Sequence, residues 1–394
     1  MRTAYLDNSA TTRVDENAAK VMKEAMLNNY GNPSSMHLFG EGAKDLLENA
    51  RQAIAAQINA NAHDIIFTSG GTEANNLAIR GVLANSKKKR IVTSAFEHPS
   101  VLNLCKELEK EGYSLTLVKP DREGIISAEK VRNAITPDTA LVSIMHANNE
   151  IGTIQPVEEI AKACKEKGAL FHTDAVQSFK KLPIDVKASG IDLMSFSSHK
   201  IHGPKGAGAL YVRHGLSLHP LVYGGHQERN IRPGTENIPG IAGFAKAAEK
   251  KIDTGRMQKL RDYFISRVLK EIPDTMLNGS KQKRLCNNAN ISFKYIEGEG
   301  LLLYLSMKGI AVSTGSACSS SELEPSHVLL AIGLKHEEAH GSLRFTLSRD
   351  TTKQELDYTV KELKDIVKTL RKMSPLKGGN RNSVSGLSSL KGGK

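Results

Sequence analysis

The sequence predicts an α/β fold, with a large domain built on a mainly parallel sheet and a smaller α+β domain. The chain has 394 residues, which is more than one hydrophobic core usually supports. Between residues 64 and 215, short apolar runs alternate with amphipathic stretches, a pattern typical of β–α units on a parallel sheet. After residue 240 this alternation stops, which indicates a second unit.

Seven apolar runs are expected to form the strands of the large domain, which we assign to residues 13–256. The runs cover residues 64–70, 90–96, 114–120, 139–147, 169–175, 192–198 and 208–213. Three stretches between them carry apolar residues at helical spacing, and we expect helices at 72–86, 98–112 and 156–168.

The smaller domain is expected to combine residues 1–12 with residues 257–374. A long helix is predicted around residues 240–270. Beyond it, the pattern predicts strands at 288–296 and 341–348 and helices at 298–309 and 353–373. Residues 375–394 are rich in Gly, Ser and basic residues and poor in apolar ones, so we predict a disordered tail.

Composition and charge argue against several classes of protein. The sequence has no basic and apolar leader and no apolar run long enough to cross a bilayer, so we expect a cytoplasmic protein with no membrane contact. The net charge is +12, but basic runs such as residues 87–90 are short and lack interleaved aromatic residues. We therefore expect a solvated surface, with a patch for an acidic partner as the alternative, and no direct binding of nucleic acid. The cysteines form no CxxC pair, so neither a disulfide framework nor a zinc site is expected from them.

A phosphate site is one interpretation of residues 69–73, SGGTE, because an open α/β sheet binds its ligand beyond the carboxyl ends of its strands. Gly70 and Gly71 let backbone amides approach an anion, Thr72 adds a hydroxyl, and the start of the following helix favours negative charge. Taken alone, the residues fit an ordinary strand-to-helix turn equally well. Their spacing matches neither GxGxxG nor a P-loop.

Asp174 falls at the end of an apolar run, where a buried carboxylate needs a partner. The protonated ring nitrogen of a heterocyclic cofactor is one such partner, and the pair would make the ring an electron sink. A surface aspartate or a helix cap is the alternative. Gln177 follows three residues later and is a candidate for the same site.

The strongest local signal is residues 197–206, SSHKIHGPKG, directly after a predicted strand. Partial desolvation of a lysine at a strand end frees its amine to form a Schiff base, and Lys200 is a better candidate than Lys205 because it follows Ser197 and His199. Those two side chains are candidate phosphate ligands, and a basic loop is the alternative. His199 and His202 also raise a metal hypothesis, but their loop spacing does not favour it and we expect no metal.

Taken together, these motifs resemble those of cysteine desulfurases of the NifS/IscS type, which belong to the class V aminotransferases and have PLP fold type I. The resemblance extends from residue 5 to about residue 370. It rests on YLDNSATT, YGNPSSMH, SGGTEANNLAIRG, EHPSV, HANNEIGTIQP, HTDAVQS, SSHKIHGPKGAG, GGHQERNIRPGTEN and STGSACSSSELEPSHVL. His226, in GGHQERN, departs from the smaller or acidic residue expected there, which leaves the details of substrate entry or the subunit interface in doubt.

The resemblance implies pyridoxal 5'-phosphate (PLP) as cofactor and L-cysteine as substrate. It implies a Schiff base on Lys200, with His98 stacked on the ring. It also implies that Asp174 pairs with the ring nitrogen and that Gln177 contacts the ring hydroxyl. The phosphate would be bound by Gly71, Thr72, Ser197 and His199, and the substrate carboxylate by Asn149 and Arg344. Thr235 would reach the phosphate from the neighbouring subunit, which implies a homodimer.

Cys318 lies in a stretch of small residues, 313–321, that is suited to a moving thiol. In isolation it would be an incidental exposed thiol. The resemblance implies that it takes the sulfur as a persulfide and passes it to an iron–sulfur scaffold protein or to tRNA thiolation. Cys105 and Cys164 fall at apolar positions of predicted helices and are expected in the core, whereas Cys286 carries no signal.

Two other functions remain open on the sequence. A selenocysteine lyase would use the same scaffold with a different chalcogen. A non-catalytic interaction protein would keep the fold as a platform for partners, although the presence of Lys200, Asp174, His98 and Cys318 argues against this interpretation.

Overall fold

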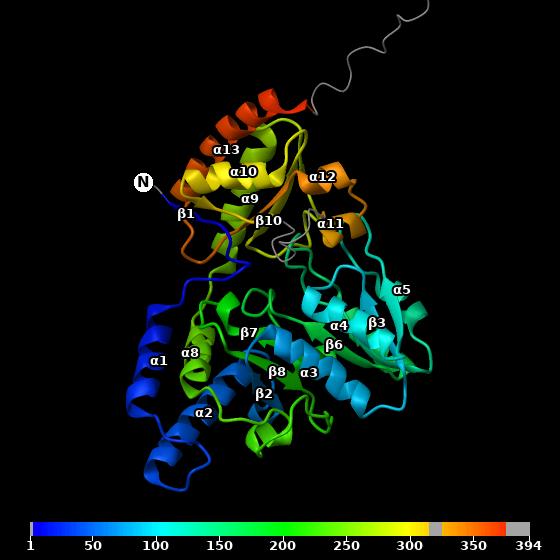
Figure 1. Ribbon diagram of the computed structural model, residues 1–394, viewed down its shortest axis with the longest axis vertical. Helices are drawn as coiled ribbons and strands as arrows, with labels where there is room; N and C mark the ends of the chain where they lie inside the picture. Colours follow the sequence, from blue (N-terminus) through cyan, green and yellow to red (C-terminus); the bar gives the residue numbers. More distant parts are fainter. Residues whose placement is uncertain (1–2, 315–324, 376–394) are drawn as a thin grey trace, which may run out of the picture.

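The computed structural model describes residues 3–314 and 325–375 of the chain. Two bodies of secondary structure lie one above the other, each around its own sheet (Figure 1). The central sheet of the larger body has the strand order β2-β8-β7-β6-β5-β3-β4. Its strands are β2 Ile65–Thr68, β3 Arg90–Ser94, β4 Ser114–Val118, β5 Thr139–Ser143, β6 Leu170–Asp174, β7 Leu193–Ser197 and β8 Gly208–Val212.

The predicted α/β class and all seven predicted strands of this sheet are confirmed. Only β8 runs antiparallel to its neighbours in the sheet, β2 and β7. The carboxyl ends of β2, β3, β5, β6 and β7 therefore open at the same edge of the sheet. Strands β5, β7 and β8 are buried along their whole length, as expected of a sheet covered by helices on both faces.

Helices on this sheet correspond to the three predicted ones and two short additions. They are α3 Gly71–Ala84, α4 Pro99–Lys110, α5 Ala128–Ala134, α6 Val157–Lys167 and α7 Val186–Ser189. Helix α3 packs on β7 and β8 and buries one apolar stripe that includes Leu77 and Val82. This contact fixes the start of α3 at the sheet edge where the strands end.

Helices α1 Glu16–Asn28, α2 Leu38–Ala56 and α8 Ile238–Glu249 pack together beside the sheet, and the first two were not predicted (Figure 1). The single long helix predicted around residues 240–270 is wrong. The chain leaves α8 in an extended conformation at Lys250, and Asp253 then caps a new helix, α9 Thr254–Glu271, by accepting a hydrogen bond from the Arg256 amide.

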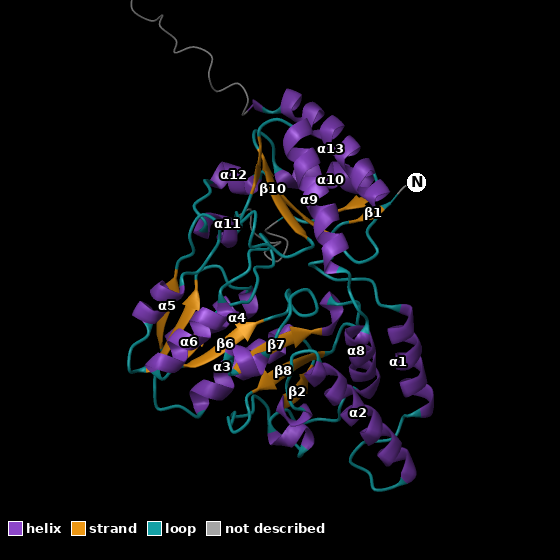
Figure 2. Cartoon of the chain, turned by 180° about the vertical axis from the view of Figure 1, so that it is seen from behind, coloured by secondary structure: helices purple, strands orange, loops and turns teal. Residues whose placement is uncertain are grey.

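The second body has an antiparallel sheet of order β12-β10-β9, seen from behind in Figure 2. The strands of this sheet are β9 Thr275–Leu277, β10 Asn288–Phe293 and β12 Ser342–Thr346. The body also contains the helices α10 Gly298–Met307, α11 His327–Ala331, α12 His336–His340 and α13 Lys353–Met373, and the strand β1 Ala4–Tyr5, which pairs with β11 Ile310–Ala311. Ala4 and Leu6 pack in the hydrophobic cluster of this body with Phe264, Phe293 and Phe345.

The bounds of the two domains stay a prediction. The predicted tail lies outside the described residues except for Pro375. Among the helices that the structure describes, none is both long and apolar enough to cross a membrane.

Candidate active site

A cavity of about 310 Å³ lies where the strand ends of the large sheet meet the second body. It brings together ten of the residues that the sequence singled out, namely Gly71, Thr72, His98, Asn149, Asp174, Gln177, Ser197, His199, Lys200 and Arg344. Thr235 is exposed and lies outside this lining set, and Cys318 lies outside the described residues.

Asp174, the last residue of β6, is almost fully buried at the floor of the cavity. Its Oδ2 accepts a hydrogen bond from Asn75 Nδ2 at 2.8 Å, and its Oδ1 accepts one from the Val176 amide at 2.9 Å. Both donors are neutral, so they orient the carboxylate without cancelling its charge. A cationic ligand group placed here would meet a fixed negative partner.

The start of α3 borders the same cavity through Gly71 and Thr72. A Cβ atom on Gly71 would lie 2.6 Å from Val176 Cγ2, so only glycine lets the helix start approach the sheet this closely. Gly70, at the N-cap position, has no side chain to cap the first amides. Glu73 in the first turn bonds to Arg232 at 2.8 Å instead, which lowers the pKa of Glu73 against the effect of its burial. The helix start is therefore available to an anion.

Lys200 ends a short 3₁₀ helix, η2 Ser198–Lys200, that follows β7. Its Nζ donates hydrogen bonds to the carbonyl oxygens of Ser9 and Ala10, at 2.6 Å each. The amino-terminal segment thus crosses the cavity above the lysine. The same segment is also held by a hydrogen bond from the Thr12 amide to the His199 carbonyl, at 2.9 Å.

Two histidines of the cavity are held neutral by burial. Burial, together with Lys200 and Lys205, lowers the pKa of His199 to about 4. Burial also lowers the pKa of His98, although Asp174 opposes this shift. His98 is the N-cap of α4, and its Nδ1 lies 2.7 Å from Ser100 Oγ, which fixes the ring at the cavity wall. A neutral, fixed imidazole is suited to stack on an aromatic ligand.

Arg344 is the cavity residue that comes from the sheet of the second body, on β12. Its Nη2 donates to Asp7 Oδ1 at 2.9 Å and its Nη1 donates to the Asn149 carbonyl at 3.1 Å. Arg344 Nε and Asn149 Oδ1 are buried and find no partner among the described residues. Part of the polar capacity of this pair therefore remains for a ligand, and an arginine fork is suited to a carboxylate.

The two chain segments that flank residues 315–324 are tied to this cavity. Ser313 forms backbone hydrogen bonds with Arg344 on one side. On the other side, Ser326 Oγ donates to the Glu150 carboxylate, and His327 Nε2 lies 2.9 Å from the Glu97 carbonyl. Glu150 directly follows the cavity residue Asn149, and Glu97 directly precedes His98. The segment that carries Cys318 thus begins and ends on contacts next to cavity residues.

Glu97 and Glu150 are buried, and burial raises the pKa of both carboxyl groups. Burial raises the pKa of Glu97 to about 8, although hydrogen bonds from Ser94 and the Met145 amide oppose the shift. Burial raises the pKa of Glu150 to about 7, against the opposing effect of Ser326 and Arg344. Neither group was singled out from the sequence, nor were Asn75 and Ser100. All four belong to motifs quoted above, but their spacing carries no local chemical signal.

Comparison with known proteins identifies the family. The model of the aminotransferase class-V family matches residues 4–359, and the chain belongs to this family. Cysteine desulfurase IscS of Dictyoglomus turgidum is 51% identical over 383 residues, which cover 95% of this chain and 97% of the relative. Cysteine desulfurase IscS of Methanosarcina thermophila is 50% identical over 382 residues, covering 95% and 94%.

Solved structures agree with this assignment. A NifS-like protein superimposes with a TM-score of 0.88 at 37% identity and covers 94% of this chain and 100% of its own. A structure described as SspA in complex with cysteine gives a TM-score of 0.81 at 38% identity, covering 89% and 100%. The predicted fold class and family resemblance are therefore confirmed.

Proposed function

We propose that this chain is a PLP-dependent cysteine desulfurase, which converts L-cysteine to L-alanine and keeps the sulfur as a persulfide on Cys318. The observation that carries the proposal is the joint presence of Lys200, Asp174, the open start of α3 and Arg344 around one cavity. Relatives that are named cysteine desulfurase support the same activity, because they are identical to this chain at about half of the positions over nearly its whole length.

The polar atoms that line the cavity fit the functional groups of PLP. Asp174 offers an uncompensated buried carboxylate to the ring nitrogen, and the amides at Gly71 and Thr72 would hold the phosphate with Ser197 and His199. Gln177 Oε1 is buried and finds no partner among the described residues, while its Nε2 donates to the Ser9 carbonyl at 3.0 Å. This amide would turn toward the ring hydroxyl. When bound, PLP supplies an electron-poor ring that makes the α-proton of an attached amino acid removable.

The side chains divide the remaining work. With cofactor and substrate bound, Arg344 and Asn149 would hold the carboxylate of L-cysteine, and the His98 ring would pack on the cofactor. The Lys200 amine would take the α-proton of the substrate and would supply a proton to the carbon skeleton of the product. Cys318 Sγ attacks the substrate sulfur. In the net reaction the Cβ–S bond of cysteine breaks and an S–S bond forms on Cys318. The carbon skeleton is thereby reduced to alanine, and the enzyme thiol is oxidised to a persulfide.

A homodimer with shared sites is part of the proposal. The segment between α1 and α2 exposes Tyr30 and Met36, and the start of α2 exposes Leu38 and Phe39. The rings of Tyr30 and Phe39 stack, with their centroids 5.5 Å apart. Ser34 of this segment and Glu236, the neighbour of Thr235, line one surface cavity. A second copy that covers this apolar patch would bring Thr235 of each chain toward the other chain.

Sulfur delivery completes the proposed role. The relatives named cysteine desulfurase favour cysteine over selenocysteine as substrate, and the similar structure in complex with cysteine agrees with this choice. We propose an iron–sulfur scaffold protein, or another sulfur acceptor such as the tRNA thiolation machinery, as the recipient. Cys105, Cys164 and Cys286 are buried free thiols, which suits a reducing compartment such as the cytoplasm.

The experiment that tests the proposal measures alanine and sulfide from L-cysteine in the presence of dithiothreitol and added PLP. Wild type is expected to release the two products in equal amounts. Cys318→Ala is expected to lose both by at least about a hundredfold, whereas the matched control Cys164→Ala, which removes a buried thiol of α6, keeps both. Alanine from L-selenocysteine but none from L-cysteine would establish the lyase instead.

A further inference from the structure

A second group of chemically active side chains lies at the opposite edge of the large sheet. His63 and Asp64 belong to a short 3₁₀ helix, η1 Ala62–Asp64, just before β2, and His214 follows β8 by two residues. Because β2 and β8 are antiparallel and Ile65 pairs with Tyr211, the start of one strand meets the end of the other. Their other ends, where Thr68 pairs with Gly208, lead to the PLP cavity.

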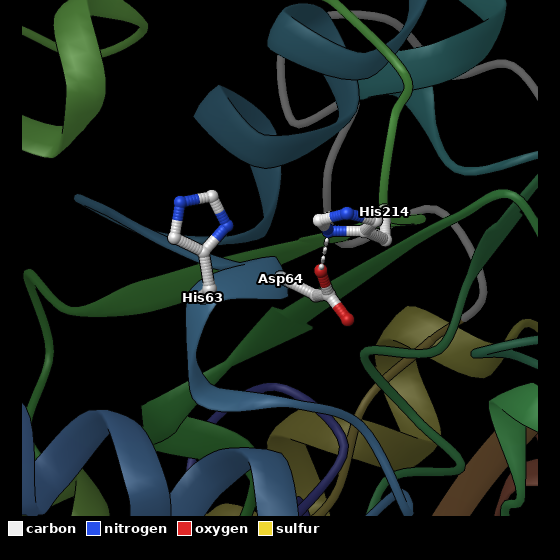
Figure 3. Close-up of side chains that lie close together, drawn as sticks. All are labelled: His63, Asp64 and His214. Atoms are coloured by element: carbon white, nitrogen blue, oxygen red, sulfur yellow. Dashed lines mark ion pairs between the residues drawn. The ribbon is translucent and has the colours of Figure 1, made fainter.

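The three side chains lie close together beyond the paired ends of β2 and β8, as Figure 3 shows. One donor atom from each lies within 4.8 Å of the others. His214 Nδ1 is 3.7 Å from Asp64 Oδ1, and the rings of His63 and His214 meet at 64° with centroids 6.2 Å apart. Zinc ligands at about 2.0 Å in tetrahedral geometry are about 3.3 Å apart. The donor atoms would therefore have to close by at most about 1.5 Å.

The carboxylate is the fixed member of the group. The side chain of Asp64 is only 6% exposed, whereas that of His214 is 79% exposed and can rotate toward it. Asn61 Nδ2 donates to Asp64 Oδ2 at 3.1 Å and leaves Oδ1 directed at the imidazole. The adjacent cation Arg213 is bound to Asp192, which offsets its repulsion of a second cation.

We propose that His63, Asp64 and His214 form a surface site for a divalent transition metal ion of the Zn²⁺ or Cu²⁺ class. Two imidazoles and one carboxylate are the donor types that these ions accept, and three protein ligands leave a coordination position for water or an external ligand. Asn61 is the supporting partner that orients the carboxylate. The site is independent of the desulfurase proposal, because it lies at the other edge of the sheet.

The test uses the tag-free full chain carrying Cys318→Ser, so that the reactive thiol does not compete, and follows Zn²⁺ by equilibrium dialysis with metal analysis. One Zn²⁺ ion per chain is expected. His63→Ala, His214→Ala and Asp64→Asn are each expected to weaken binding at least about tenfold, and Asn61→Ala up to about tenfold. Circular dichroism verifies the fold of each variant. A stoichiometry that these substitutions leave unchanged overturns the proposal.

A matched control comes from a histidine pair on another helix of the chain. His336 and His340 are four residues apart on α12, in the sequence HEEAH. Their joint replacement by alanine is expected to leave Zn²⁺ binding unchanged, and loss of binding in this control also overturns the proposal. With Cys318 restored, His63→Ala and His214→Ala are expected to keep the wild-type rate of alanine formation. Failure of the metal site and failure of the desulfurase proposal are thus distinguishable.

Discussion

The two sheets of the molecule contribute very differently to the cavity. The strand ends and helix starts of the large sheet supply Asp174, Ser197, Lys200, His98 and Gly71, whereas the smaller sheet supplies Arg344. On the proposed function, the large sheet holds the cofactor, whereas the second body supplies Arg344 for substrate recognition and carries the sulfur. Substitutions in the two bodies should therefore cause different defects, namely cofactor failure in one case and weak substrate binding or sulfur transfer in the other.

The largest effect is expected on the cofactor side. Lys200→Ala removes the proposed attachment point and base, so alanine formation should fall by at least about a thousandfold. Lys205→Ala, an exposed lysine five residues later, is the matched control and should stay within about twofold of wild type. Product assay by amino-acid analysis checks both variants. Equal losses in the two would remove the special role of position 200.

Asp174→Asn tests a second cofactor-binding residue of the large sheet. The asparagine amide keeps the size of the side chain and one of the two acceptor oxygens that bind Asn75 and Val176, but it removes the negative charge. We therefore expect a loss of about a hundredfold in kcat. Bound PLP should also dissociate more readily. Spectroscopic measurement of retained cofactor, together with steady-state kinetics, tests this prediction, and an unaltered kcat would contradict it.

Arg344→Lys tests the contribution of the second body to substrate binding. Lysine keeps the charge but loses the planar fork, so KM for L-cysteine should rise by about tenfold or more while cofactor retention stays at the wild-type level. A variant that instead loses PLP with KM unchanged would show that the division of labour between the two sheets is wrong.

Ser326→Ala should give a smaller effect on sulfur transfer. It removes the contact with Glu150 next to the proposed cofactor and substrate site, so we expect persulfide formation to slow by about threefold to tenfold while bound PLP is unchanged. Glu150→Gln is the conservative partner variant. Its neutral amide should keep part of the rate, because the buried Glu150 carboxyl, whose pKa is about 7, is already partly protonated at neutral pH. Rapid-quench measurement of persulfide against alanine separates this effect from loss of substrate binding.

The smallest expected effect is on the pH dependence of stability and does not involve catalysis. Burial lowers the pKa of His172 to about 3, and its ring contacts Ser143 on β5 and Ser195 on β7. The unfolded chain takes up a proton at about pH 6.5 and the folded one does not, so stability falls as the pH decreases from about 6.5 toward 3. His172→Gln should lower the free energy of unfolding at pH 7. When the pH falls from 7 to 5, however, the variant should lose about 1 to 2 kcal/mol less of this free energy than wild type does. Thermal unfolding of both proteins at pH 7 and 5 provides the measurement.

Much of the cofactor side could be predicted from the sequence because its residues directly follow apolar runs that must be strands. Asp174 and Lys200 are examples, since strand ends of a parallel sheet share one edge. Glu97 and Glu150 were missed because their importance lies in contacts with residues more than 170 positions away. The cluster of His63, Asp64 and His214 was missed because only the register of β2 with β8 brings these residues together. The break between α8 and α9 was missed because the apolar spacing continues across it, whereas the cap at Asp253 decides the boundary.

One measurement addresses the central claim, that the ε-amino group at position 200 carries the cofactor. Borohydride reduction of the protein reconstituted with PLP, followed by peptide mapping, should find the pyridoxyl group on the peptide that contains Lys200. Recovery of the adduct on another lysine, or on none, would contradict the account.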